Sequence, residues 1–432
     1  MKRLLALLPI ILFVILVTVQ PTLQAQEPET NYDEAKVPQY KLPAPLVCED
    51  GSAVTDSSQW FAKRRPEVLK LFRNQVYGNA PGLPQSVSYR TVESGEAFDG
   101  LAVRKQVEIT LHNGGRNLTV GLLLYIPARH DGGGAPAFLG LNFAGNHTLS
   151  DDSAIALNTN WMRPRKDSGI DNNRATEAAR GKASSRWAIE MILRRGYAVA
   201  SAYYGDIDPD FHDGFGNGVH ALFDAKGGDS RAADAWGSIG AWAWGLSRIM
   251  DYLETDSDID HGRVTVLGHS RLGKTSLWAG AQDKRFAMVI SNNSGCGGAA
   301  LSRRAFGETV RVINESFPHW FCGNFKKYNG KVSTLPVDQH LLLSLIAPRP
   351  VYVASAEQDR WADPRGEFLS LKNADPVYAM VAGDTLASAG MPDVNSAVIG
   401  RMSYHMRSGK HDVTNYDWDK YLQWADSYMK RR

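Results

Sequence analysis

Apolar residues along the chain fall into short strand-like runs that alternate with longer segments of helical periodicity. Two strands are predicted first, over 101–111 and 118–126, and Asn113-Gly114-Gly115 between them is typical of a hairpin turn. Later apolar runs predict strands over 137–143, 197–203, 286–291, 349–354 and 402–407, and one that begins at Val264. Helices are predicted over 60–77, 186–195, 235–253 and 416–429.

The segment from Gly268 to Gly273 follows the Val264 strand and leads directly into a helical pattern. A Gly-x-Ser turn between a strand and a helix is typical of a nucleophile elbow, which raises a serine hydroxyl above the edge of a sheet. Here the second glycine comes one position later than in the usual G-x-S-x-G pattern. Several strands are apolar throughout, which indicates a mainly parallel sheet with helices on both faces. With an elbow at Ser270, this order predicts an α/β-hydrolase fold.

The N-terminus has the features of a secretion signal. Two basic residues precede an apolar run over 4–19, and Leu23-Gln24-Ala25 offers a small-residue cleavage site, so 1–25 is predicted to be a signal peptide. A membrane anchor is the alternative, but the run is short for a membrane span and lacks a basic flank after it. We therefore expect a secreted or periplasmic protein.

The rest of the chain is expected to form one domain. Residues 26–45 are polar and contain several prolines, which predicts an extended or disordered arm, and 46–432 are predicted to be a single catalytic domain. Within it, the helix over 60–77 is expected to turn Phe61, Val68, Leu71 and Phe72 inward, and 150–183 to form a polar surface insertion.

Composition narrows the classes of partner. The chain has 432 residues, of which 43% are hydrophobic and 22% charged, a balance that supports a large core. Without 1–25 it carries 46 basic and 46 acidic residues, since that segment removes two of the 48 cations and no anion. A neutral protein has no electrostatic reason to bind nucleic acid or an anionic membrane, and we expect a monomer that binds neither. No His-Glu-x-x-His pair occurs among the eleven histidines, so neither a metal nor a cofactor is expected.

The three cysteines are Cys48, Cys296 and Cys322. An exported protein permits a disulfide, and an odd count leaves one thiol unpaired. We expect a Cys296–Cys322 bridge, because both residues flank the site described next.

A serine nucleophile needs a general base and an acid that orients the base. In this fold the base follows the last strand, where His411 stands in Ser408-Gly409-Lys410-His411-Asp412. His405 is the rival, but it lies within the strand pattern. The acid is expected after the preceding strand, where Asp359 is preferred and Glu357 and Asp363 compete. The acidic loop Asp206-Ile207-Asp208-Pro209-Asp210 lacks the glycine and glutamate of an EF-hand, which favours a polar loop near the site.

Five motifs together resemble the glucuronoyl esterases, carbohydrate esterase family fifteen. They are Gly268-His269-Ser270-Arg271-Leu272-Gly273-Lys274, Ser294-Gly295-Cys296-Gly297-Gly298-Ala299-Ala300, Leu335-Pro336-Val337-Asp338-Gln339-His340, Ala347-Pro348-Arg349-Pro350 and Gly409-Lys410-His411. The resemblance runs from about residue 135 to the C-terminus. It implies a serine esterase that cleaves, without a metal, the ester between (4-O-methyl-)glucuronic acid of xylan and lignin alcohols.

The resemblance also implies roles for single residues. Arg271 would help to bind the oxyanion, which suits its cationic fork. Lys274 would bind sugar hydroxyls and Glu308 would accept hydrogen bonds from the sugar, with Glu315 as the alternative to Glu308. Trp361 would line the pocket.

One position departs from the family pattern. Many members place the triad glutamate where this chain has Asn293, and an amide cannot balance an imidazolium charge. Other members use an acid after the later strand, which favours Asp359. The alternatives for function are an acetyl xylan esterase and, because of Asn293, a non-catalytic carbohydrate-binding protein of the same fold.

Overall fold

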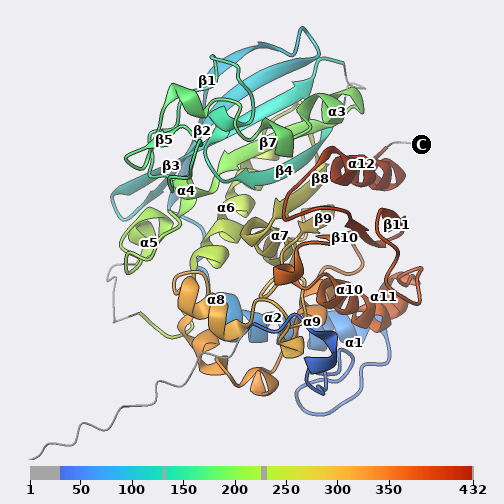
Figure 1. Ribbon diagram of the computed structural model, residues 1–432. Helices are drawn as coiled ribbons and strands as arrows, with labels where there is room; N and C mark the ends of the chain where they lie inside the picture. The colour runs from blue at the N-terminus through green and yellow to red at the C-terminus, as the bar shows by residue number, and fades with distance from the viewer. Residues whose placement is uncertain (1–29, 130–132, 225–230, 431–432) are drawn as a thin grey trace, which may run out of the picture. The chain divides into compact units, whose positions relative to one another are not determined.

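Figure 1 shows the computed structural model, which describes residues 30–129, 133–224 and 231–430. The strands are β1 (Ser86–Ala97), β2 (Ala102–Asn113), β3 (Arg116–Pro127), β4 (Ala135–Asn142), β5 (Ile170–Asp171), β6 (Arg174–Ala175), β7 (Ala198–Tyr203), β8 (Ile259–His269), β9 (Met288–Asn292), β10 (Val351–Ala356), β11 (Ser396–Val398) and β12 (Met402–Arg407). The helices are α1 (Ser57–Gln59), α2 (Arg65–Phe72), α3 (Ile189–Arg194), α4 (Tyr204–Ile207), α5 (Gly218–Phe223), α6 (Ser238–Leu253), α7 (Arg271–Gln282), α8 (Val310–Ser316), α9 (Gln339–Ser344), α10 (Pro364–Asn373), α11 (Asp375–Ala382) and α12 (Asn415–Met429).

A ten-stranded sheet organises the fold, in the order β1-β2-β3-β7-β4-β8-β9-β10-β12-β11. The strands from β7 to β12 along this order pair in parallel, whereas β1, β2 and β3 pair antiparallel at one end and β11 at the other. Helices cover both faces (Figure 1). The predicted α/β fold with a mainly parallel central sheet is confirmed.

Side chains that alternate along the strands divide the core into two layers. Leu139 of β4 and Val266 of β8 belong to the cluster that contains the apolar residues of α6 and α7. Their neighbours Phe138 and Leu267 belong to the other cluster, with the apolar residues of α3 and α12. Each central strand is therefore buried on both faces, which explains why these strands are apolar throughout.

The helix before β1 differs in detail from its prediction. It runs from Ser57 to Tyr77 and includes two π-helical stretches, Trp60–Arg64 and Arg73–Tyr77. A π turn holds more residues than an α turn and rotates the side chains that follow it. Trp60 is therefore fully buried while Phe61, predicted to face inward, is 38% exposed.

The compact unit begins at Asn31 rather than at residue 46. Residues 31–45 form an irregular segment with one short 3₁₀ turn, Glu34–Lys36. Hydrogen bonds and ion pairs attach this segment to the rest of the domain. Arg304 Nη2 lies 2.6 Å from Glu34 Oε1, and His340 Nε2 donates to Pro43 O over 2.9 Å. The predicted signal peptide lies outside the described residues.

The expected Cys296–Cys322 bridge is wrong. All three cysteines are free and buried. Cys322 Sγ is directed at Asn74 O, 3.9 Å away on the N-terminal helical segment, and burial raises the pKa of this thiol to about 11. The two cysteines are separate parts of the apolar core, which a sequence spacing cannot distinguish from a bridged pair.

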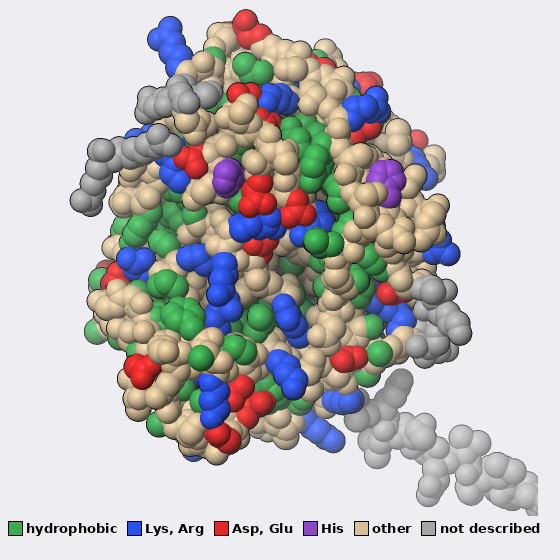
Figure 2. Space-filling view, turned by 180° about the vertical axis from the view of Figure 1, so that it is seen from behind, with side chains coloured by type: hydrophobic (Ala, Val, Ile, Leu, Met, Phe, Trp, Pro, Cys, Tyr) green, Lys and Arg blue, Asp and Glu red, His purple; other side chains and the backbone are tan. Residues whose placement is uncertain are grey.

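The distribution of surface charge and the length of the apolar helices bear on whether the protein binds nucleic acid or a membrane. On the face shown in Figure 2, basic and acidic side chains are interspersed, in line with the balanced charge of the chain. Of the helices in the described part of the chain, none is long and apolar enough to cross a membrane.

Candidate active site

Ser270 stands in a strained turn between β8 and α7. Its backbone has φ 58° and ψ −128°, a conformation that costs a non-glycine residue about 1–3 kcal/mol. The turn is closed because Ser270 N donates to Asn292 O of β9 over 2.9 Å. A Cβ at Gly268 would lie 1.9 Å from Leu272 O, so only glycine allows helix α7 to start so near the strand. These features are those of a nucleophile elbow.

The later position of the second glycine also has a structural reason. A Cβ at Gly273 would lie 3.0 Å from Ser294 Cβ and 3.1 Å from Gly268 O. Gly273 therefore lets α7 approach the loop that follows β9. The shifted motif serves the same close approach as the usual one.

The structure brings His411 and Asp359 together. His411 Nδ1 donates to Asp359 Oδ2 over 2.5 Å, and the Asp359 side chain is 6% exposed. Burial raises the pKa of Asp359, but the hydrogen bond and charge of His411, with a hydrogen bond from Asn293, outweigh burial and hold this pKa below its ordinary value. Asp359 is thus an ionised carboxylate that fixes which nitrogen of His411 carries the proton.

The imidazole of His411 also lies beside the elbow. Its ring centroid is 4.4 Å from that of His269, the residue before Ser270. Within the described residues, the Ser270 hydroxyl has no hydrogen-bond partner. Catalytic hydrogen bonds are often longer in the free enzyme and shorten when substrate binds.

The other acids and the rival histidine are placed elsewhere. Glu357 is exposed at the end of β10. Asp363 caps α10 through Gly366 N, 2.9 Å away, and pairs with Arg304 over 2.8 Å. His405 is buried, with Nε2 2.9 Å from Asp417 Oδ1 and Nδ1 2.9 Å from the Tyr352 hydroxyl. Of these candidates, Asp359 and His411 alone contact each other.

Asn293 contacts the same carboxylate. Its Nδ2 donates to Asp359 Oδ2 over 2.8 Å, and its backbone adopts a left-handed conformation with φ 47°. Asparagine is among the few non-glycine residues that favour this region. The amide of Asn293 therefore serves as a donor to the acid.

Arg271, at the start of α7, is held in a cage of aromatic rings and one carboxylate. Its Nη1 donates to Asp210, and its guanidinium lies 4.9 Å from the Trp320 ring centroid. His319 Nε2 and Trp320 Nε1 also donate to Asp210, over 2.9 and 2.7 Å, and the pKa of Asp210 is lowered to about 2 because these donors and Arg271 outweigh burial. Arg271 Nε is buried and, among the described residues, without a hydrogen-bond partner. The contacts with Asp210 and the aromatic rings hold the guanidinium of Arg271 in a fixed position beside the elbow.

Lys274, Glu308 and Trp361 form a second group beside the elbow. Lys274 Nζ donates to Ser294 O and lies 3.7 Å from Glu308 Oε2, and both side chains are at most 7% exposed. Burial raises the pKa of Glu308, and Lys274 opposes that rise. Glu308 N donates to Trp361 O over 2.9 Å, and Trp361 is 41% exposed. Glu315, the alternative to Glu308, is half-exposed on α8 and pairs with Arg311.

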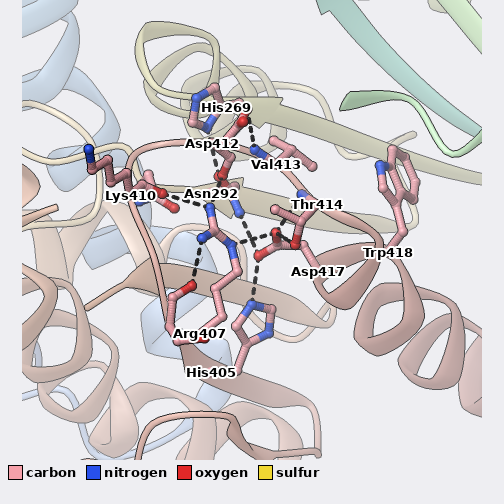
Figure 3. Close-up of polar contacts among 12 residues, drawn as sticks. His269, Asn292, His405, Arg407, Lys410, Asp412, Val413, Thr414, Asp417 and Trp418 are labelled. Atoms are coloured by element: carbon pink, nitrogen blue, oxygen red, sulfur yellow. Dashed lines mark hydrogen bonds and ion pairs between the residues drawn. The ribbon is translucent and has the colours of Figure 1, made fainter. Parts of the chain in front are cut away.

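A buried ion pair that sequence reasoning missed supports the loop of His411 (Figure 3). Arg407 donates to three carbonyl oxygens on this loop: Ser408 O at 3.0 Å, Lys410 O at 2.9 Å and Asp412 O at 2.5 Å. Its Nε donates to Asp417 Oδ2 over 2.7 Å, and Asp417 also caps α12 by accepting from Thr414 N. The Thr-x-x-Asp pattern at the start of α12 was a signal for this cap.

The same ion pair is connected to the elbow. Asn292 Nδ2 donates to Asp417 Oδ1 over 3.2 Å, and Asn292 Oδ1 lies 2.7 Å from His269 Nδ1. Burial keeps the pKa of His269 well below its ordinary value, so the ring is neutral and Nδ1–H is the donor. A continuous polar network therefore joins the loop that carries His411 to the residue before Ser270.

The three carboxylates of the acidic loop over 206–210 each contact different residues. Asp206 accepts from Asn158 and Asn160, both over 2.8 Å, while Asp210 holds Arg271. Asp208 lies 3.6 Å from His220 Nε2. Within the described ranges, no group of three or more His, Cys, Asp or Glu side chains is arranged to hold a metal ion.

Comparison with known proteins gives consistent matches. A family model described as "Glucuronyl esterase, fungi" matches residues 223–382. A carbohydrate esterase of an unknown prokaryotic organism is 50% identical over 429 residues, 99% of each chain. A 4-O-methyl-glucuronoyl methylesterase of Wolfiporia cocos is 27% identical over 84% of this chain and 76% of its own.

Solved structures agree with these matches. A structure described as a promiscuous CE15 esterase from the marine bacterial metagenome superposes with a TM-score of 0.87 at 52% identity, over 93% of this chain and 100% of that one. A glucuronoyl esterase from Solibacter usitatus gives 0.86 at 46% identity, over 92% and 100%. The similarity thus extends through the elbow, the His411 loop and the group around Lys274.

Proposed function

The chain belongs to the glucuronoyl esterases of carbohydrate esterase family 15, which are carboxylic ester hydrolases, and on this premise we propose that it cleaves the ester between (4-O-methyl-)glucuronic acid of xylan and lignin alcohols with a Ser270–His411–Asp359 triad. The observation that carries the proposal is the 2.5 Å contact of His411 with the buried Asp359, beside a serine in an elbow. These are the parts that acyl transfer through a serine requires.

In the first half of the reaction, Ser270 Oγ attacks the uronoyl carbonyl carbon while its proton passes to His411 Nε2. The carbonyl oxygen becomes an oxyanion, which Arg271 and backbone N–H groups at the start of α7 stabilise. The bond from carbon to the alkoxy oxygen then breaks, and His411 gives its proton to that oxygen. The alcohol leaves, and the uronate remains attached to Ser270 as an ester.

In the second half, water replaces the alcohol. The oxygen of the water attacks the acyl carbon while His411 takes a proton from the water. His411 returns that proton to Ser270 Oγ when the bond between the acyl carbon and serine breaks. Asp359 stabilises the imidazolium that forms twice in each cycle and keeps Nε2 directed at the reacting oxygen.

Lys274 and Glu308 support a sugar on the acyl side. Both are nearly buried and 3.7 Å apart, so each presents one polar group where a hydroxyl can bridge or replace their contact. A buried charge that loses its partner costs free energy, so a ligand without hydroxyls is disfavoured there. An acetyl group has none, and we expect the enzyme to turn over a glucuronate ester much faster than acetyl xylan.

The test of the mechanism uses Ser270→Ala and benzyl glucuronate. We expect hydrolysis to be abolished while circular dichroism shows an intact fold, and a fluorophosphonate to label the wild type but not the variant. Full activity in Ser270→Ala would contradict the mechanism, and absence of labelling in the wild type would favour a protein that binds carbohydrate without catalysis.

We further propose that the enzyme is exported after cleavage near Ala25 and acts as a monomer. N-terminal sequencing of the protein recovered outside the cytoplasm and its elution volume on size exclusion test these two points. A mature N-terminus at Met1 would contradict the first.

A further inference from the structure

A cavity of about 360 Å³ opens beside the elbow, on the face of the sheet covered by α12. Its apolar wall includes the rings of Phe143, Trp187 and Trp418, which follow β4, precede α3 and lie on α12. Aromatic walls favour a flat apolar ligand, because ring pairs gain more than their buried area alone. Nothing in the proposed mechanism so far uses this space.

The lining of the cavity contains residues adjacent in sequence to Ser270 and His411 and none of the sugar group. His269, which precedes Ser270, lines it, and so do Asp412 and Val413, which follow His411. Lys274, Glu308 and Trp361 do not belong to its lining. Because His411 protonates the leaving oxygen, the residues next to His411 border the path of the alcohol rather than that of the uronate.

The charge of the cavity is uneven. Four cations, Arg165, Lys166, Lys182 and Arg186, line it with only two carboxylates, Asp167 and Asp412. Arg186 pairs with Asp412 over 2.6 Å. In the part of the chain that the structure describes, the side chains of Arg165, Lys166 and Lys182 have no ion-pair partner. Their positive charge is therefore free to act on a ligand.

Two further groups connect the cavity to the chemistry. Burial, and next the like charge of Arg271, lower the pKa of Arg165, so Arg165 lies within electrostatic range of the oxyanion arginine. His269 is neutral, its Nδ1–H is used by Asn292, and its Nε2 is buried without a partner among the described residues.

We propose that this cavity is the subsite for the leaving group and that it favours an aromatic alcohol bearing an anionic substituent. The inference rests on the proposed esterase function and adds the chemistry of the alcohol to it. The aromatic wall holds the ring, and Lys166 and Lys182, both exposed at the rim, attract the negative charge. Attraction by exposed lysines is screened by salt.

The test compares two esters of the same uronate, benzyl and 4-carboxybenzyl. We expect kcat/KM for the 4-carboxybenzyl ester to be about fivefold higher at low salt, the size of one exposed ion pair. The ratio of the two values should fall toward one in Lys166→Gln/Lys182→Gln and in the wild type at high salt. Lys284→Gln is the control, because Lys284 is also exposed but lies in the turn between α7 and β9, outside the cavity lining.

The outcomes separate this inference from the proposed function. A ratio of one in the wild type, or a ratio that the double variant leaves unchanged, overturns the subsite. Loss of the ratio in Lys284→Gln as well would assign it to net charge and also overturn it. The esterase function fails only if the wild type hydrolyses neither ester.

Discussion

At the scale of single residues, the carboxylate that serves His411 is chosen by burial and by its partners. Asp359, Glu357 and Asp363 follow the same strand, β10, within seven positions. Glu357 is exposed, Asp363 is engaged with Arg304 and the start of α10, and Asp359 receives both His411 and Asn293. A carboxylate that balances an imidazolium must be held in place, and Asp359 is held from two sides.

The residue-scale prediction is that Asp359→Asn lowers kcat on benzyl glucuronate at least about a hundredfold, because a neutral amide cannot stabilise imidazolium. Glu357→Gln is the matched control, an acid on the same loop that should keep turnover near that of the wild type. Steady-state kinetics of both variants decide the assignment. If Glu357→Gln is the damaging change and Asp359→Asn is not, the acid is misassigned.

At the scale of elements, the loop between β12 and α12 carries His411 without regular structure of its own. Arg407, the last residue of β12, replaces that structure by donating to the carbonyl oxygens of Ser408, Lys410 and Asp412 (Figure 3). Arginine suits this position because its planar group offers five donors in a fixed geometry. Asp417 of α12 completes the arrangement from the other side of the loop.

We predict that Arg407→Met lowers kcat by about tenfold to a hundredfold with little change in KM, since a small misplacement of a catalytic group is costly. Arg407→Lys should lose less, because lysine keeps the charge beside Asp417 but cannot bind three carbonyls. Arg195→Met is the control: it removes the 2.7 Å contact of an exposed arginine with Asp426 on the same helix. A rise in KM at constant kcat, or an equal loss in Arg195→Met, would exclude a positioning role.

At the scale of the whole molecule, the loop after β9 is tied to α10 by a buried carboxylate. Glu367 accepts from Ser294 N over 2.7 Å, Gly295 N over 2.9 Å and the Ser355 hydroxyl over 2.6 Å. Burial nevertheless raises the pKa of Glu367 to about 7 from an ordinary 4.5. The folded protein therefore binds a proton there that the unfolded chain releases at lower pH.

The sign of this linkage gives a prediction. A folded pKa above the unfolded one contributes stability that is fully present below pH 4.5 and is lost as the pH rises through about 7. Relative to Glu367→Gln, which does not titrate, the wild type should lose unfolding free energy between about pH 5 and pH 8. Urea unfolding of both proteins at these two pH values measures the change, and a difference that stays constant with pH would contradict it.

How far the sequence predicted the fold depended on where each element lies. The central strands were predicted to within a few residues because burial on both faces leaves an apolar run. Strand β1 was not predicted: nearly all of its residues are exposed or half-exposed, so its sequence resembles that of a loop. The rotation of side chains after Trp60 was missed because π turns leave no mark in an α-helical periodicity.

The residues of the candidate site also fall into those that the sequence could predict and those that it could not. Ser270, Asp359 and His411 could be proposed from their positions relative to strands, since the end of each strand in a parallel sheet has a known location. Arg407, Asp417 and Asn292 could not, because their partners lie on other elements and no local pattern distinguishes them from ordinary polar residues. The free thiols of Cys296 and Cys322 show the same limit.

By itself, the sequence determined the order of strands and helices and the elbow at Ser270, because apolar periodicity and glycine positions act locally. Only the tertiary structure decided which carboxylate serves His411, which cations line the cavity beside it and which cysteines remain apart. Those outcomes depend on contacts between segments up to hundreds of residues apart, and at such separations the position along the chain does not say which segments meet in space.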